Sequence, residues 1–154
     1  MTKLKIKKLH PDAVEPRYVT PGAACFDLHY LPSLSQAVVM VFPGEAACFR
    51  TGLAFEIPEG HVMLVFSRSG QGFNQDIRLS NCVGVIDSDY RGEVMVKLRN
   101  DQESQDEGAS VTSIHPGDRI AQAMIVPIPK VEIEVVDDLS STARGTGGFG
   151  STGA

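Results

Sequence analysis

Residues 81–99 read NCVGVIDSDYRGEVMVKLR, and this stretch gives the first indication of both the fold and the functional site. The apolar run Cys82–Ile86 stops at the polar segment Asp87–Gly92, and Glu93–Arg99 then alternates polar and apolar side chains. An apolar strand, a polar turn and an alternating strand predict a β-hairpin. The turn contains two carboxylates, a hydroxyl, a phenol and a guanidinium, which is more than a solvent-facing turn needs. We therefore expect a functional site here.

The rest of the chain repeats this pattern of short strands and turns. Pairs such as Pro43-Gly44 and Pro116-Gly117 separate the apolar runs at short intervals. No long stretch has a helical period, and only Ser67–Gly72 could begin a short helix. The pattern predicts an all-β subunit, a sandwich or barrel. The expected strands are 4–9, 37–42, 46–57, 62–66, 82–86, 93–99, 119–126 and 131–136.

Composition favours one globular domain and argues against nucleic-acid binding. The chain has 154 residues, 42% of them hydrophobic, and a net charge of −5. A nucleic-acid-binding surface usually carries a basic stripe, and the one basic cluster, Lys3–Lys8, alternates with Leu4 and Ile6. This alternation is typical of the solvent face of a strand.

Cysteine usage and hydropathy indicate the compartment. The three cysteines are Cys25, Cys48 and Cys82; their odd number and irregular spacing fit neither a disulfide framework nor a metal site. Cys82 lies in an apolar run and is expected to be buried. There is no signal peptide or membrane-length apolar run. We expect a soluble cytoplasmic protein without membrane contact.

The last segment, Ser140–Ala154, differs from the rest in composition. It reads SSTARGTGGFGSTGA and has no core-forming residues apart from one aromatic. Gly145–Gly150 matches G-x-G-x-x-G, but too few residues follow for the helix that a dinucleotide site requires. We therefore expect a β domain over residues 1–139 and a mobile arm over residues 140–154.

Four polar islands accompany this tail: Asp27, Arg68–Gly70, Asp87–Gly92, and Gly117–Arg119 with Gln122. Each alone could be structural, since Asp27 could be a hydrogen-bonding carboxylate and Arg119 could pair with a surface acid. Together they supply what phosphate-ester chemistry needs. Cationic groups and N–H donors hold phosphates, and carboxylates orient an attacking water and the water shell of a metal.

These segments resemble, in order and at family spacing, the five motifs of the trimeric dUTPase family. The matching stretches are PGAACFDL (21–28), SRSGQG (67–72), NCVGVIDSDYRGEV (81–94), GDRIAQ (117–122) and RGTGGFGSTG (144–153). The resemblance spans nearly the whole chain. Three positions depart from the common pattern: Cys25 and Asp76 stand where glycine is frequent, and Ser67 stands where many members have proline.

The resemblance implies a jelly-roll-like β subunit in a homotrimer whose active sites are shared between subunits. The implied reaction is Mg²⁺-dependent hydrolysis of dUTP to dUMP and pyrophosphate, which limits uracil incorporation into DNA and supplies dUMP for thymidylate synthesis. It places the first and third motifs on one subunit, the second and fourth on a neighbour and the tail on the third.

The resemblance also assigns roles to residues. Asp87 would orient and activate the attacking water, and Asp27 would hold Mg²⁺ through water. Tyr90 would lie against the deoxyribose and Phe149 would stack on the uracil. The full set of expected substrate-binding residues is Arg68, Ser69, Gly70, Asn81, Val85, Tyr90, Gln122, Arg144, Phe149, Gly150 and Ser151.

Two alternatives stay open at this point. One is the related dCTP deaminase, which carries out a different reaction on a similar fold. The other is a binding or regulatory protein that retains the fold without the activity. The tail and the segment 81–94 favour the hydrolase over the deaminase, and the presence of every expected catalytic residue type argues against an inactive relative.

Overall fold

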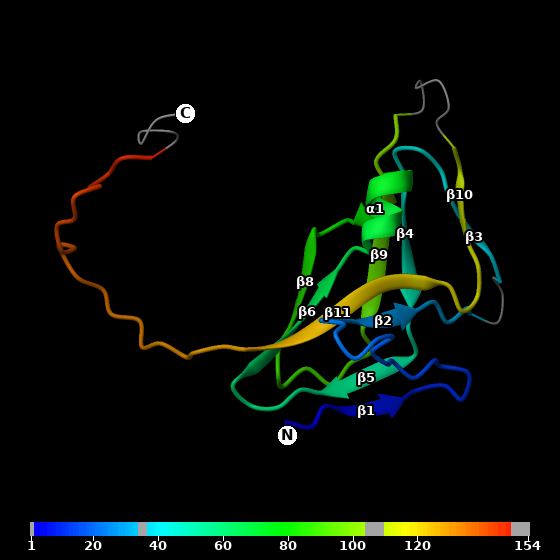
Figure 1. Cartoon of the computed structure of the whole chain (residues 1–154), viewed down its shortest axis with the longest axis horizontal. Helices are drawn as coiled ribbons and strands as arrows, with labels where there is room; N and C mark the ends of the chain where they lie inside the picture. The colour runs from blue at the N-terminus through cyan, green and yellow to red at the C-terminus, as the bar shows by residue number, and fades with distance from the viewer. Residues whose placement is uncertain (1, 34–36, 104–109, 149–154) are drawn as a thin grey trace.

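The structure is a computed structural model that describes residues 2–33, 37–103 and 110–148 (Figure 1). Short strands make up most of its regular elements, and one short helix lies among them in the described residues. The elements are β1 (Lys5–Lys8), β2 (Phe26–His29), β3 (Val39–Val41), β4 (Ala46–Arg50), β5 (Leu53–Glu56), β6 (His61–Phe66), α1 (Ser69–Gln75), β7 (Ile77–Leu79), β8 (Val83–Ile86), β9 (Met95–Asn100), β10 (Thr112–Ile114) and β11 (Arg119–Pro127).

Two antiparallel sheets carry the fold, which confirms the all-β expectation. One has the strand order β2-β11-β6-β8 and the other β4-β9-β7, and the pairs β1-β5 and β10-β3 flank them (Figure 1). No closed barrel forms among the described strands. The helix α1 begins in the segment for which the sequence allowed a short helix.

A single apolar core joins the two sheets. Leu28 and Met63 from one sheet pack in the same cluster as Phe49 and Leu98 from the other, and all four side chains are buried. This is the expected result of period-two alternation, because each strand turns one row of side chains inward. The last fully buried residue of this core along the chain is Ala123 in β11, so the described residues after it contribute no fully buried side chain to the core.

The expected hairpin around residues 87–92 is wrong. β8 pairs with β6, from Val83 opposite Phe66 to Ile86 opposite Met63, whereas β9 pairs with β4 and β7 in the other sheet. The connection between them crosses from one sheet to the other, and Val94 N–H donates to the Leu53 carbonyl at 2.9 Å. Residues 87–92 therefore connect a strand of one sheet to a strand of the other and do not form the tip of a hairpin.

Two further expectations are corrected. Cys82 is exposed rather than buried, because the chain turns there in a left-handed conformation, with φ of 63°, before β8 begins. Residues 131–136 form no strand, although their sequence alternates. Val131, Ile133 and Val135 are 76%, 87% and 96% exposed, and none of the described strands pairs with this segment.

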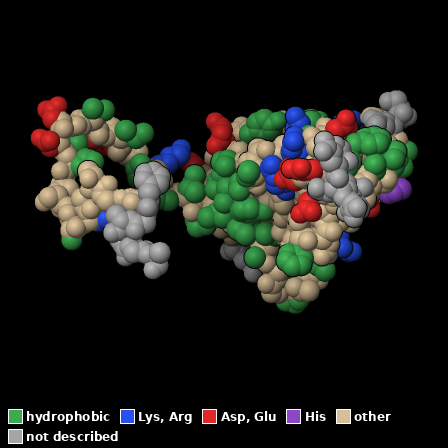
Figure 2. Space-filling view, turned by 90° about the horizontal axis from the view of Figure 1, so that it is seen from above, with side chains coloured by type: hydrophobic (Ala, Val, Ile, Leu, Met, Phe, Trp, Pro, Cys, Tyr) green, Lys and Arg blue, Asp and Glu red, His purple; other side chains and the backbone are tan. Residues whose placement is uncertain are grey.

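The segment after β11 leaves the body. Figures 1 and 2 show residues beyond Pro127 running away from the sheets as an extended arm. Ile128 N–H still donates to the Gly60 carbonyl at 2.8 Å, which fixes the root of the arm. No helix in the described part of the chain is long and apolar enough to span a membrane.

Candidate active site

The first group of expected site residues centres on Asp27 in β2. One carboxylate oxygen accepts from Arg68 Nε at 3.1 Å, and the other accepts from Arg119 Nη1 at 3.3 Å. The Asp27 side chain is only 14% exposed, while Arg68 and Arg119 are 24% and 49% exposed. A largely buried carboxylate thus holds two guanidinium groups, and each keeps other N–H donors available for an anion.

Gln122 and Ser67 connect this group to the helix. In the sheet, Gln122 of β11 lies opposite both Asp27 and Phe66. Its Nε2 donates to the Ser67 carbonyl at 2.9 Å, and Ser67 Oγ accepts from Leu79 N–H, also at 2.9 Å. The chain is therefore held firmly just before Arg68, and Ser69 and Gly70 follow as exposed residues in the first turn of α1.

Burial alters the titration of two neighbours of Asp27. His29 follows on β2, its Nδ1 is buried, and no described group hydrogen-bonds to that atom. Burial lowers the pKa of His29, with Arg119, Arg68 and Arg17 adding to the effect and Asp27 opposing it. Burial, and then the charge of Asp27, raises the pKa of Cys25. Both groups are therefore neutral near pH 7, and the charges here belong to Asp27 and the arginines.

The second group lies where β8 ends. A hollow of about 320 Å³ is lined by side chains from β8 and the crossing segment, which are Val85, Ile86, Asp87, Tyr90, Glu93, Val94 and Met95. Three expected site residues, Val85, Asp87 and Tyr90, therefore share one hollow. Asp87 is exposed, and its carbonyl accepts from Tyr90 N–H at 3.2 Å, which closes a turn between them. Asn81 lies beyond the opposite end of β8 and is exposed.

The two groups are far apart within one chain. Asp27 pairs with Gln122, Gln122 with Phe66 and Phe66 with Val83, so three strand spacings of about 4.8 Å separate Asp27 from Val83. Asp87 lies four residues further along, or about another 13 Å. The backbone separation of Asp27 and Asp87 is thus roughly 19 Å.

Within one chain, this geometry groups the stretches differently from the expected division between subunits. Asp27, Arg68 and Gln122, from the first, second and fourth stretches, lie together in one chain. The first stretch therefore goes with the second and fourth, and not with the third. The reason is the strand order, because β2, β11 and β6 are neighbours and β8 lies at the far edge.

The tail is described only in part. Arg144 is exposed, and its Nε donates to the Gly147 carbonyl at 2.8 Å within a local turn that also joins Gly145 N–H to Thr142. The expected residues Phe149, Gly150 and Ser151 lie outside the described residues. Figure 1 shows the arm that carries this turn running away from the sheets on which both groups of site residues lie.

The set of site residues expected from the sequence omits three contributors. Arg119 lies next to a register shift in β11 that brings its guanidinium to Asp27. Ser67 holds the start of the helix, and Glu93 accepts from Arg50 Nε and Gly52 N–H. Arg119 and Glu93 belong to polar clusters that the sequence displays, but their partners are distant in the chain and no local pattern indicates them.

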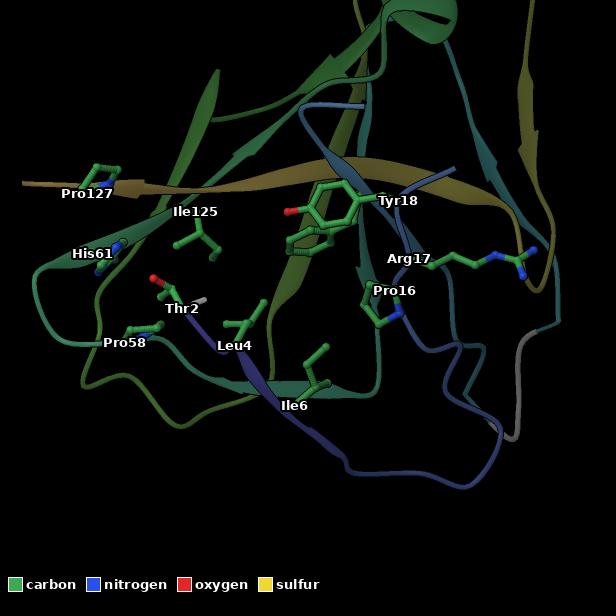
Figure 3. A pocket seen from close by; sticks show the side chains of 11 residues that line it. Thr2, Leu4, Ile6, Pro16, Arg17, Tyr18, Pro58, His61, Ile125 and Pro127 are labelled. Carbon is green, nitrogen blue, oxygen red and sulfur yellow. The ribbon is translucent and has the colours of Figure 1, made fainter. Parts of the chain in front are cut away.

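A further hollow contains none of the expected residues. Figure 3 shows it between the N-terminal strand and the root of the arm, with Leu4, Ile6, Ile125 and Pro127 among its lining side chains. Its volume is about 460 Å³. Its described lining is mostly apolar, with Arg17 and His61 as the basic side chains.

Comparison with known proteins agrees with the geometry. The family model for dUTPase matches residues 12–153. The chain belongs to the dUTPase family. The deoxyuridine 5'-triphosphate nucleotidohydrolase of Nautilia profundicola is 47% identical over 151 residues, covering 98% of this chain and 99% of that protein. The Helicobacter pylori protein of the same name is 36% identical, covering 98% and 97%.

Solved dUTPase structures share the fold. The dUTPase of Staphylococcus bacteriophage 80alpha with dUPNHPP has a TM-score of 0.85 and 29% identity, with both chains fully covered. A mutant dUTPase from phage phi11 of S. aureus, described with a coordinated structural Mg(II) ion, has a TM-score of 0.75 and 26% identity, covering 88% and 97%. The jelly-roll-like β fold of the dUTPases is therefore the fold of this chain.

Proposed function

We propose that this chain hydrolyses dUTP to dUMP and pyrophosphate. One observation carries the proposal: Asp87 and Tyr90 line a hollow at the end of β8 in a chain that matches the dUTPase family over residues 12–153. The reaction removes dUTP from the precursors of DNA synthesis and yields dUMP. The individual residue roles below rest on the positions of these side chains.

Asp87 acts on the attacking water. An exposed carboxylate at the end of a strand can accept a hydrogen bond from a water and aim its lone pair at the α-phosphorus. The water oxygen forms the new bond to phosphorus, the bond to the α–β bridging oxygen breaks, and pyrophosphate leaves with that oxygen. Positioning contributes more than basicity, because a carboxylate is a weak base.

The free edge of β8 reads the base. Among the described strands, β8 is the last of its sheet and pairs with β6 alone, so its outer backbone N–H and C=O groups are available. Such groups at strand spacing can match the donors and acceptors of uracil, with Asn81 and Val85 at this edge. Cytosine presents the opposite pattern and would leave buried polar groups unpaired, which gives strong discrimination.

Arginines and exposed backbone groups bind the triphosphate. Arg68 and Gln122 lie beside Asp27, and Ser69 and Gly70 offer N–H groups in the first turn of α1. The tail closes over the nucleotide: Arg144 meets the γ-phosphate, and Gly150 and Ser151 approach the phosphates. Phe149 stacks on the uracil, which is worth about 1–3 kcal/mol in comparable base stacking.

The residues at Asp27 fit Mg²⁺ bound through water. Each Asp27 oxygen accepts one arginine hydrogen bond and retains another lone pair. Among the described residues no three His, Cys, Asp or Glu side chains form a metal-binding group. Mg²⁺ commonly binds substrate phosphates and keeps several waters, and it would neutralise phosphate charge when bound. Asp27 then orients one water of that shell.

The functional unit is a homotrimer with shared sites. A single chain leaves Asp87 roughly 19 Å from Asp27, further apart than one α-phosphate and its metal waters extend. A second copy that brings its β8 end to the Asp27 group of the first removes this gap. The exposed apolar side chains of the arm also suit burial against another copy.

A panel of nucleotides tests the proposal. We expect pyrophosphate release from dUTP at least roughly a hundredfold faster than from dCTP, dTTP or UTP, and suppression by EDTA that Mg²⁺ reverses. Ammonia release from dCTP would instead indicate the deaminase. No turnover of any nucleotide, with dUTP still bound, would indicate a binding protein.

A further inference from the structure

Tyr90 lies against the backbone of Gly92, where any larger residue would displace the tyrosine ring. A β-carbon built on Gly92 would overlap the Tyr90 hydroxyl oxygen and lie 2.5 Å from ring Cζ and 3.0 Å from ring Cε2. Carbon atoms in contact are normally about 3.5–4.0 Å apart. The φ of Gly92 is not in the left-handed region, so the reason for glycine here is the close approach of the ring.

The Tyr90 hydroxyl is also fixed. It donates to the Glu93 carbonyl at 3.1 Å, so both the ring and its polar end are held by the two residues that leave the turn. The Glu93 side chain is anchored in turn: its carboxylate accepts from Arg50 Nε at 3.1 Å and from Gly52 N–H at 2.7 Å. Only 18% of the Glu93 side chain is exposed, so this anchor is well shielded from water.

The anchor rests on the rigid junction of β4 and β5. Thr51 is buried and donates from Oγ1 to the Val94 carbonyl at 2.6 Å, next to Glu93. Gly52 has φ of 69°, and an added β-carbon there would lie 2.5 Å from Leu31 Cδ2. The surface that holds Tyr90 is therefore joined to the core rather than to a free loop.

We propose that Gly92 is a positioning residue for sugar discrimination, and that it sets how far the Tyr90 ring stands from the nucleotide's 2' position. The inference rests on the proposed function, in which Tyr90 faces the deoxyribose. The contact with Gly92 and the hydrogen bond to the Glu93 carbonyl together hold the ring in one position, so that a 2'-hydroxyl would collide with it. Without that hold, the ring can move aside and admit the hydroxyl.

A methyl group at position 92 tests this directly. To restore normal contact the Tyr90 ring must shift by about 1 Å. The side chain is 46% exposed and borders the hollow, so it has room to move without unfolding the protein. We expect a Gly92→Ala trimer to remain folded and to change its selectivity, because small displacements of positioning groups alter reactivity strongly.

The measurement is the ratio of kcat/KM for dUTP to kcat/KM for UTP. We expect Gly92→Ala to lower this ratio by about tenfold or more, mainly because kcat/KM for UTP rises. Gly22→Ala is the matched control, since an added methyl group there meets no atom within 4 Å and the ratio should stay at the wild-type value.

A double-mutant cycle separates positioning from general damage. If Gly92 acts through the Tyr90 ring, then in a Tyr90→Ala background the change Gly92→Ala should alter the dUTP-to-UTP ratio no further. An additional, independent loss of selectivity in that background would overturn the inference. So would an unchanged ratio in Gly92→Ala alone.

A second variant covers the case in which Gly92→Ala does not fold. Tyr90→Phe leaves Gly92 unchanged and removes only the hydroxyl that binds the Glu93 carbonyl. We expect it to lower the dUTP-to-UTP ratio by a smaller factor than Gly92→Ala, and an unchanged ratio would contradict the role of this hold. Failure of the wild type to hydrolyse dUTP would defeat the proposed function itself, whereas wild-type activity with an unaltered ratio in the variants defeats only this inference.

Discussion

In the proposed mechanism, Asp87 is the residue at which a change of a single atom should affect catalysis most. Asp87→Asn keeps the size of the side chain and removes its charge and its basic oxygen. We expect kcat for dUTP to fall by about a hundredfold or more, because general-base groups typically contribute that much, while the Kd for dUTP changes little. Single-turnover pyrophosphate release and equilibrium binding of dUTP measure the two quantities.

The same turn provides the control for Asp87. Asp89 lies two residues after Asp87, and its side chain is also exposed but does not line the hollow. The change Asp89→Asn therefore removes an equal charge outside the hollow. We expect it to retain most activity. Near-normal kcat in Asp87→Asn, or an equal loss in both variants, would reject Asp87 as the group that activates water.

Single residues also show what a sequence can and cannot reveal. Asp76 stands where the family favours glycine, and it adopts a left-handed conformation, with φ of 52°, at the end of α1, which is the position that glycine favours. Ser67 stands where proline is common, and its hydroxyl accepts a hydrogen bond from Leu79 N–H. The departures were visible in the sequence, but their structural consequences depend on a backbone angle and on a partner twelve residues away.

At the scale of elements, local patterns predicted strands better than strand partners. The runs at 62–66 and 119–126 became β6 and β11 because alternation or apolar content within a few residues decides extended structure. The segments on both sides of Asp87–Gly92 also became strands, yet in different sheets. Pairing depends on which edges the whole fold leaves free, and no local pattern contains that information.

The arm shows that a strand-like pattern without a pairing partner does not form a strand. Residues 131–136 have the alternation of a strand and remain outside regular structure, because a strand needs an edge to pair with. For the candidate site, the sequence identified Asp27, Arg68, Asp87 and Tyr90, since their polar side chains interrupt apolar segments. It did not identify Arg119 as a partner of Asp27, because 92 residues separate the two.

The proposed division into residues 1–139 and 140–154 makes a prediction about the tail. Deleting residues 140–154 should leave the melting temperature nearly unchanged, because the buried core ends at Ala123 and residues 140–146 are exposed. Activity toward dUTP should fall severely, since the deleted segment carries Arg144 and Phe149. Thermal unfolding and pyrophosphate release measure the two effects, and a large loss of stability or full activity would contradict the division.

At the scale of the whole molecule, the strand order determines how a site can be completed. β2 and β8 lie at opposite edges of a four-stranded sheet, so no side-chain rearrangement within one chain brings Asp87 to the Asp27 and Arg68 group. The proposed homotrimer would remove the problem, because every copy presents both edges and each could meet the complementary edge of a neighbour. Three equivalent contacts of this head-to-tail kind would close a ring.

Mixing two inactive variants tests the shared site quantitatively. Asp87→Asn and Arg68→Ala should each be nearly inactive alone. When equal amounts are unfolded and refolded together, a site that takes Asp87 from one chain and Arg68 from another has one chance in two of receiving each intact group, so about a quarter of wild-type activity should return. If one chain built the whole site, every site would keep a lesion and the mixture would stay inactive.

The control is the same treatment of each variant alone, and the formation of mixed trimers is checked by giving the two variants different masses. An inactive mixture that contains mixed trimers would therefore reject the shared site, whatever the activity of the wild type.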